Sequence, residues 1–133
     1  MKKTLLFFAL VFILGFLTTT SQSCSKKLPA DTLPAACDTL TISYNSGIAD
    51  IINRSCAYSG CHINGDVPGD FSTYQGMKSR LENGAIFDRV ITQKDNSERR
   101  MPPTYAPAGY PTELTPGELD MIHCWIADNY PEN

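Results

Sequence analysis

The sequence predicts a small all-α domain of three to five short helices joined by long irregular loops. Apolar side chains recur three and four residues apart in several short segments of the 133-residue chain, which is the spacing of one helix face. Capping residues, Gly, Asn and Pro mark the ends of the same segments. One short alternating run, residues 37–44, fits extended chain without requiring a strand.

The last predicted helix carries the most complete set of signals. Thr115-Pro116-Gly117-Glu118 is a capping box with Pro at the first helical position. The helix is expected to run to about Asn129 and to stop before Pro131. Its apolar side chains are Leu119, Met121, Ile122, Trp125 and Ile126.

Three shorter helices are predicted before it. The first is capped by Asn45 or Ser46 and leads directly into Cys56. The second is capped by Ser72, and the third spans Ala85–Thr92. The side chains expected on their inward faces are Ile48, Ile51 and Ile52 in the first, Tyr74, Met77, Lys78 and Leu81 in the second, and Ile86, Phe87 and Val90 in the third.

The N-terminal residues have the layout of a secretory signal. Two lysines precede an apolar stretch over residues 5–17, and a small, polar stretch follows up to Ser23. The apolar core is shorter than the roughly 20 residues of a membrane span, and a spanning anchor is the alternative. Cys24, with the polar residues after it, resembles the processing site of bacterial lipoproteins, where the cysteine thiol is lipidated. Simple cleavage without a lipid is the second alternative.

These features divide the chain into three segments. Residues 1–23 are expected to be a signal peptide of the lipoprotein type, residues 24–36 a lipidated tether, and residues 37–133 the domain. The tether contains two prolines and no apolar periodicity. We therefore expect a protein outside the cytoplasm, in the periplasm or at the cell surface, held to the membrane by a lipid anchor on Cys24.

The mature protein is expected to be small and acidic. Removing the two lysines of the signal takes the net charge from −3 to about −5, which argues against nucleic acid as a partner. So small a domain is marginal without a disulfide, a metal or a large apolar cofactor. In an oxidising compartment, an even number of cysteines first suggests two disulfides, with three possible connectivities. Beyond Cys24, four cysteines remain: Cys37, Cys56, Cys61 and Cys124.

The segment from Cys56 to His62 contains the groups that hold a c-type haem. Such a haem needs two thiols for its two vinyl groups and an imidazole directly after the second thiol for its iron. Cys56, Cys61 and His62 supply all three. Four residues separate the thiols where the common motif has two, and Ser59-Gly60 allows the wider loop to bulge away from the haem edge.

A Met thioether is the usual sixth ligand of an electron-transferring haem. Met77 and Met121 lie at helical spacing among apolar residues, where Met usually fills a core. Met101 lies in a Pro-rich, non-helical loop and is therefore the candidate ligand. Arg99 and Arg100, directly before it, are either partners of the haem propionates or a solvated loop pair.

The order of these features resembles the class I cytochrome c domain, and most closely the small lipoprotein-type c-domains of environmental bacteria. The resemblance spans residues 37–129 and is carried by the Cys-x4-Cys-His motif, by Gly69-Asp70-Phe71-Ser72-Thr73-Tyr74 and by Met101-Pro102-Pro103. It implies short helices wrapped around one covalent haem c, attached through Cys56 and Cys61 with His62 and Met101 as axial ligands. A haem with both axial positions filled offers no open site to a substrate, so an electron carrier with redox partner proteins, and not an enzyme, is expected.

The resemblance also bears on the remaining cysteines. The first and last helices of a class I cytochrome pack together, so a disulfide between Cys37 and Cys124 is expected at that contact. One alternative is a lipoprotein binding module with no haem, in which Cys56 and Cys61 are bridged as well. Another is a zinc site. Its ligands would come from Cys56, Cys61, Cys124 and either His62 or His123, although His123 is expected to be a surface or partly buried residue.

Overall fold

The computed structural model describes residues 33–64 and 69–133, and in these two ranges all regular secondary structure is helical, with no strand. The all-α prediction is confirmed at this level. The predicted signal peptide, the lipidation site at Cys24 and most of the tether lie outside the described residues. No helix of the described part is both long enough and apolar enough to cross a membrane.

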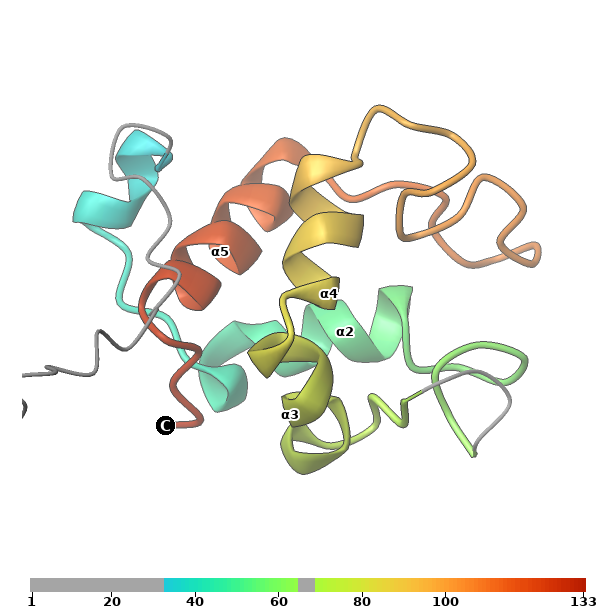
Figure 1. Ribbon diagram of the computed structural model, residues 1–133, viewed down its shortest axis with the longest axis horizontal. Coiled ribbons are helices and arrows are strands. Elements are labelled where there is room, and N and C mark those ends of the chain that lie inside the picture. The colour runs from blue at the N-terminus through green and yellow to red at the C-terminus, as the bar shows by residue number, and fades with distance from the viewer. Residues whose placement is uncertain (1–32, 65–68) are drawn as a thin grey trace, which may run out of the picture.

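The helical elements are short and follow one another closely except at two places. Long irregular loops follow α2 and η4, and Figure 1 shows both loops at the same end of the molecule. The segment 37–44 contains a 3-10 turn followed by irregular chain. In order, the elements are η2 (Ala35–Asp38), η3 (Tyr44–Ile48), α2 (Ala49–Ser55), α3 (Tyr74–Glu82), α4 (Ala85–Phe87), η4 (Asp88–Thr92) and α5 (Pro116–Ala127).

The helical segment that leads to Cys56 is capped earlier than the sequence suggested. Ser43 is the N-cap: its hydroxyl accepts from the backbone N–H of Ser46, and the Ser46 hydroxyl accepts from the Ser43 N–H. The chain bends directly afterwards at Gly47, which has a φ of 134°. The prediction of Asn45 or Ser46 as the cap was therefore wrong by two or three residues, because Ser46 serves as the N3 partner of a capping box. The predicted inward residues Ile48, Ile51 and Ile52 are buried.

Helix α3 begins one residue later than predicted. Thr73 is its N-cap and accepts from the Gly76 N–H at 3.1 Å. Ser72 is engaged elsewhere, since its N–H and its hydroxyl both donate to the Asp70 carboxylate. Met77 and Leu81 are buried as expected, but Lys78 is exposed, so its placement on the inward face was wrong.

Helix α5 has the predicted capping box between Thr115 and Glu118 and ends at Ala127. Trp125 and Ile122 are its most deeply buried side chains. The indole Nε1 of Trp125 donates to the Pro131 carbonyl at 2.9 Å, and the same carbonyl accepts from the Tyr44 N–H. The C-terminal residues thus bring α5 and η3 together in the core.

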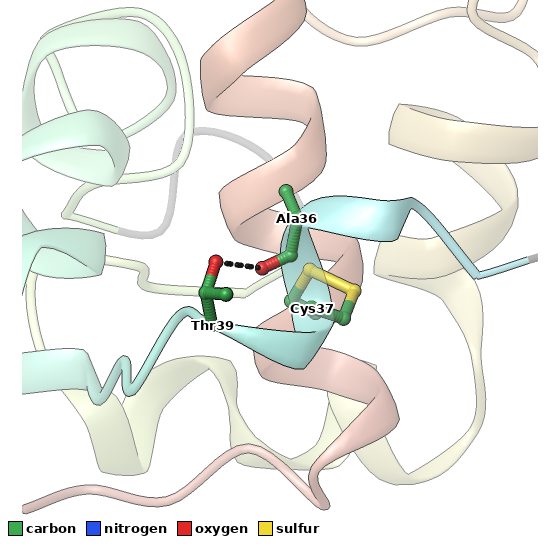
Figure 2. The surroundings of a disulfide bond; sticks show 4 residues. Ala36, Cys37 and Thr39 are labelled. Carbon is green, nitrogen blue, oxygen red and sulfur yellow. Dashed lines mark hydrogen bonds between the residues drawn. A yellow bond between two sulfur atoms is a disulfide. The ribbon is translucent and has the colours of Figure 1, made fainter.

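A disulfide joins the N-terminal turn to the last helix. Cys37 in η2 is bonded to Cys124 in α5, with 5.1 Å between the two Cα atoms and 87 positions between them in the sequence. Figure 2 shows the η2 turn against α5, with the Thr39 hydroxyl donating to the Ala36 carbonyl. This is the pairing expected for these two cysteines, and it closes most of the domain into one covalent loop.

Candidate cofactor site

A cavity of about 420 Å³ lies beside the two long loops. Its size is within the range of about 300 to 1,000 Å³ that is common for small-molecule sites. The residues that border it come from α2, α3, α4, η4 and both loops, and many are apolar, including Ile52, Ile86, Val90, Pro102 and Pro103. All four residues predicted to hold a haem also border it: Cys56, Cys61, His62 and Met101.

Cys56 is held at the end of α2. Its N–H donates to the Ile52 carbonyl at 2.8 Å, and the Ala57 N–H donates to the same carbonyl. The side chain is buried, and its thiol is free, as is that of Cys61. Burial, together with the nearby Cys61, raises the pKa of the Cys56 thiol to about 12, so the thiol is uncharged at neutral pH.

The wide loop between the thiols is divided into an inner and an outer half. Ala57 and Tyr58 are buried, while Ser59 and Gly60 are exposed. The loop is closed by the Cys61 N–H, which donates to the Tyr58 carbonyl, and by the His62 N–H, which donates to the Cys56 carbonyl at 3.1 Å. Gly60 borders the cavity although it is exposed, so the bulge of the whole loop away from a haem edge stays a prediction. Tyr58 borders the cavity, a position that spacing alone did not indicate.

His62 is paired with an aromatic side chain. Its imidazole stacks on the ring of Phe71, with centroids 4.1 Å apart and ring planes 7° apart. The Phe71 N–H donates to the His62 carbonyl at 2.8 Å. Both side chains border the cavity. Phe71 was part of the segment that carried the family resemblance, but no role had been assigned to it.

Met101 reaches the cavity from the second loop. It is half-buried, and its N–H donates to the Arg89 carbonyl in η4. Met77 is fully buried in the core, and neither Met77 nor Met121 borders the cavity. Of the three methionines in the described part of the chain, only Met101 therefore shares a cavity with His62.

The charged residues at the cavity are Arg80 and Arg89, and none of its described lining residues is Asp or Glu. Within residues 33–64 and 69–133, neither arginine forms an ion pair, although Arg89 donates to the Arg99 carbonyl at 2.7 Å. Arg99 pairs with Asp88 and Arg100 with Glu113. The two arginines singled out from the sequence thus lie outside the cavity. Two others, which no short motif marked, face it.

Two buried hydroxyls at the cavity have no hydrogen-bond partner among the described residues. They are Ser55 Oγ, on a residue that is 1% exposed, and Tyr58 Oη, on a residue that is 5% exposed. Burial, followed by the nearby Cys61, raises the pKa of Tyr58, so its hydroxyl keeps its proton. Buried polar groups are almost always paired in native proteins. The Tyr58 hydroxyl lies beside the Cys61 thiol, so Ser55 Oγ is the group that favours a polar ligand in the cavity.

The remaining candidate ligands lie apart from this cavity. Cys124 is bonded to Cys37, so its thiol is not available to zinc. His123 is buried, contrary to the expectation of a surface or partly buried residue, and its ring lies edge-on to that of Phe87. Burial lowers its pKa, partly offset by Asp120. Among the described residues, no group of three or more His, Cys, Asp or Glu side chains is placed to hold a metal ion.

Comparison of the chain with known protein families, with curated proteins and with solved structures gave no match.

Proposed function

We propose that this protein is a mono-haem c-type cytochrome that carries electrons. The observation that supports it most is that Cys56, Cys61, His62 and Met101 border one cavity. Met101 is separated from His62 by α3, α4 and η4, and it comes from the other long loop. Two free thiols, an imidazole and a thioether are the complete set of protein groups that a His/Met-ligated haem c requires.

The rest of the cavity also fits a haem. Its mainly apolar lining suits the porphyrin face, and its volume is that of a cofactor site. Arg80 and Arg89, without a carboxylate beside them, suit a ligand with two negative charges, and a haem carries two propionates. The unpaired hydroxyl of Ser55 offers a further donor.

In this proposal, each residue has a defined task. Cys56 and Cys61 would hold the haem covalently through their thiols, and His62 and Met101 would supply the imidazole and the thioether that ligate its iron. When bound, the haem supplies a one-electron couple between ferric and ferrous iron. The protein's part is to exclude water with its apolar side chains and to set the potential through the thioether ligand and the nearby arginines. With both axial positions filled, electron transfer and not catalysis is the activity that the site supports.

The proposed location and partners follow from the N-terminal segment. A signal peptide over residues 1–23 and a lipid on Cys24 would hold the domain outside the cytoplasm at a membrane surface. The redox partners would then be proteins in the same compartment. The Cys37–Cys124 disulfide is compatible with such an oxidising location.

The direct test is to produce the full chain with and without a c-type haem maturation system. A denaturing gel stained for haem should show colour that stays with the protein, and intact mass should increase by one haem. The matched control is the variant Cys56→Ser/Cys61→Ser, which should lose the stain. A colourless product with a Cys56–Cys61 disulfide would instead support the haem-free binding module.

A further inference from the structure

The ring of Phe71 stacks on the His62 imidazole. The ring planes of the two residues differ by only 7°, at a centroid distance of 4.1 Å, so the imidazole and the phenyl ring lie face to face. The backbones are joined as well, because the Phe71 N–H donates to the His62 carbonyl at 2.8 Å. Phe71 is 7% exposed, so its ring is largely shielded from water, whereas His62 is half-buried.

Gly69 leaves the space that the Phe71 ring occupies. A Cβ atom at position 69 would lie 2.6 Å from Cε1 of Phe71, which is closer than real contacts allow. The φ of Gly69 is 97°, a conformation that favours glycine. The edge of the Phe71 ring at Cε1 therefore lies against the bare backbone of Gly69, while its face lies against the imidazole.

The segment that carries Phe71 is anchored to the start of α3. The Asp70 carboxylate accepts from the N–H and the hydroxyl of Ser72. The Asp70 carbonyl packs against Gly76, where any side chain would collide with it. These contacts tie the backbone beside Phe71 to the start of α3.

We propose that Phe71 is a positioning residue that fixes the plane of the His62 imidazole, and that Gly69, which has no side chain, leaves room for the edge of the Phe71 ring. The inference rests on the proposed haem function, in which His62 is an axial ligand. An axial imidazole can rotate about its bond to the iron, and a ring stacked on its face opposes that rotation. In this proposal, Phe71 acts on the haem by holding the His62 imidazole.

The test uses the haem-loaded full chain and a spectroscopic signal of ligand orientation. Phe71→Leu removes the aromatic face and keeps apolar bulk, and Phe71→Tyr restores the face. The control is Phe87→Leu, which removes the other Phe–His ring contact of the domain, at His123 and away from the cavity. Low-spin ferric haem gives an electron paramagnetic resonance spectrum whose largest g-value depends on the plane of the axial imidazole.

We expect Phe71→Leu to shift or broaden the largest g-value, and we expect Phe71→Tyr and Phe87→Leu to keep the unaltered spectrum. Gly69→Ala, which displaces the ring without removing it, should shift the signal too and serves if Phe71→Leu does not fold. Haem attachment with an unchanged spectrum in Phe71→Leu and Gly69→Ala overturns the inference alone. Absence of haem from the unaltered chain overturns the proposed function, and the inference with it.

Discussion

Tyr58 stacks on Tyr110, with ring centroids 3.7 Å apart and ring planes 14° apart. Tyr58 lies between the two thiols, and Tyr110 lies in the Pro-rich loop that follows Met101. The stack therefore joins the loop that carries Cys61 and His62 to the loop that carries Met101. Tyr58, one of the four residues between the two thiols, thus has a structural role in the wide cysteine spacing.

Tyr110→Ala should lower the free energy of unfolding by about 1 kcal/mol beyond the effect of lost burial, since a stacked aromatic pair contributes about 0.5 to 1.5 kcal/mol. Urea denaturation of the unaltered chain and the variant measures the difference. Tyr105→Ala is the matched control, because that side chain is 79% exposed and makes no ring contact in the described structure. Equal losses in the two variants would contradict a role for the stack.

Met101→Ala should alter the spectrum of the reduced haem protein and lower its reduction potential, because a thioether ligand stabilises ferrous iron. Met77→Ala should leave the spectrum unchanged while costing roughly 2 to 5 kcal/mol of stability, since Met77 is fully buried in the core. Visible spectroscopy and redox titration, with urea denaturation alongside, separate the two effects. A spectral change in Met77→Ala alone would count against Met101 as the ligand.

Arg80→Gln and Arg89→Gln should each lower the reduction potential, because a nearby positive charge favours the ferrous state. The expected size is on the order of 1 kcal/mol per arginine. Arg54→Gln is the control, since Arg54 pairs with Glu118 and does not border the cavity. Redox titration of the three variants tests the assignment, and an equal shift in Arg54→Gln would show that net charge alone is responsible.

In the haem-free chain, Cys61 should be alkylated before Cys56. With a pKa of about 12, Cys56 is thiolate in roughly one molecule in ten thousand at pH 8. Cys56 is also buried, whereas Cys61 is partly exposed. Timed reaction with iodoacetamide, followed by peptide mass spectrometry at pH 8 and pH 10, measures both rates. Faster labelling of Cys56 at pH 8 would show that its thiol is not buried as described.

Replacing both Cys37 and Cys124 by Ala should destabilise the domain strongly. The disulfide joins positions 87 apart, and chain-entropy scaling gives about 4 to 5 kcal/mol for a loop of that length. Since removal of native disulfides typically costs about 2 to 5 kcal/mol, the melting temperature should fall by at least about 8 °C. Calorimetry of the unaltered chain with and without reductant provides the comparison, and identical melting curves would exclude a stabilising bridge.

The sequence by itself determined the elements that depend on local chemistry. The capping box at Thr115 and Glu118 and the apolar periodicity of the short helices specify structure through neighbours in the chain, and these predictions held. The errors at Ser46, Ser72 and Lys78 were also local. For the two caps, several polar side chains near the helix start can serve as the N-cap, and the choice depends on which hydrogen bonds the surrounding backbone allows.

The Cys56, Cys61 and His62 motif could be recognised in the sequence because its members lie within seven residues of one another. Which other residues border the cavity depends on the tertiary structure. Arg80 and Arg89 face the cavity only because α3 and η4 pack beside it, and the arginines next to Met101 are taken up by Asp88 and Glu113. Stacking partners such as Tyr58 and Tyr110 come from different loops. Contacts of this kind depend on how the helices pack, and no periodicity or spacing along the chain encodes them.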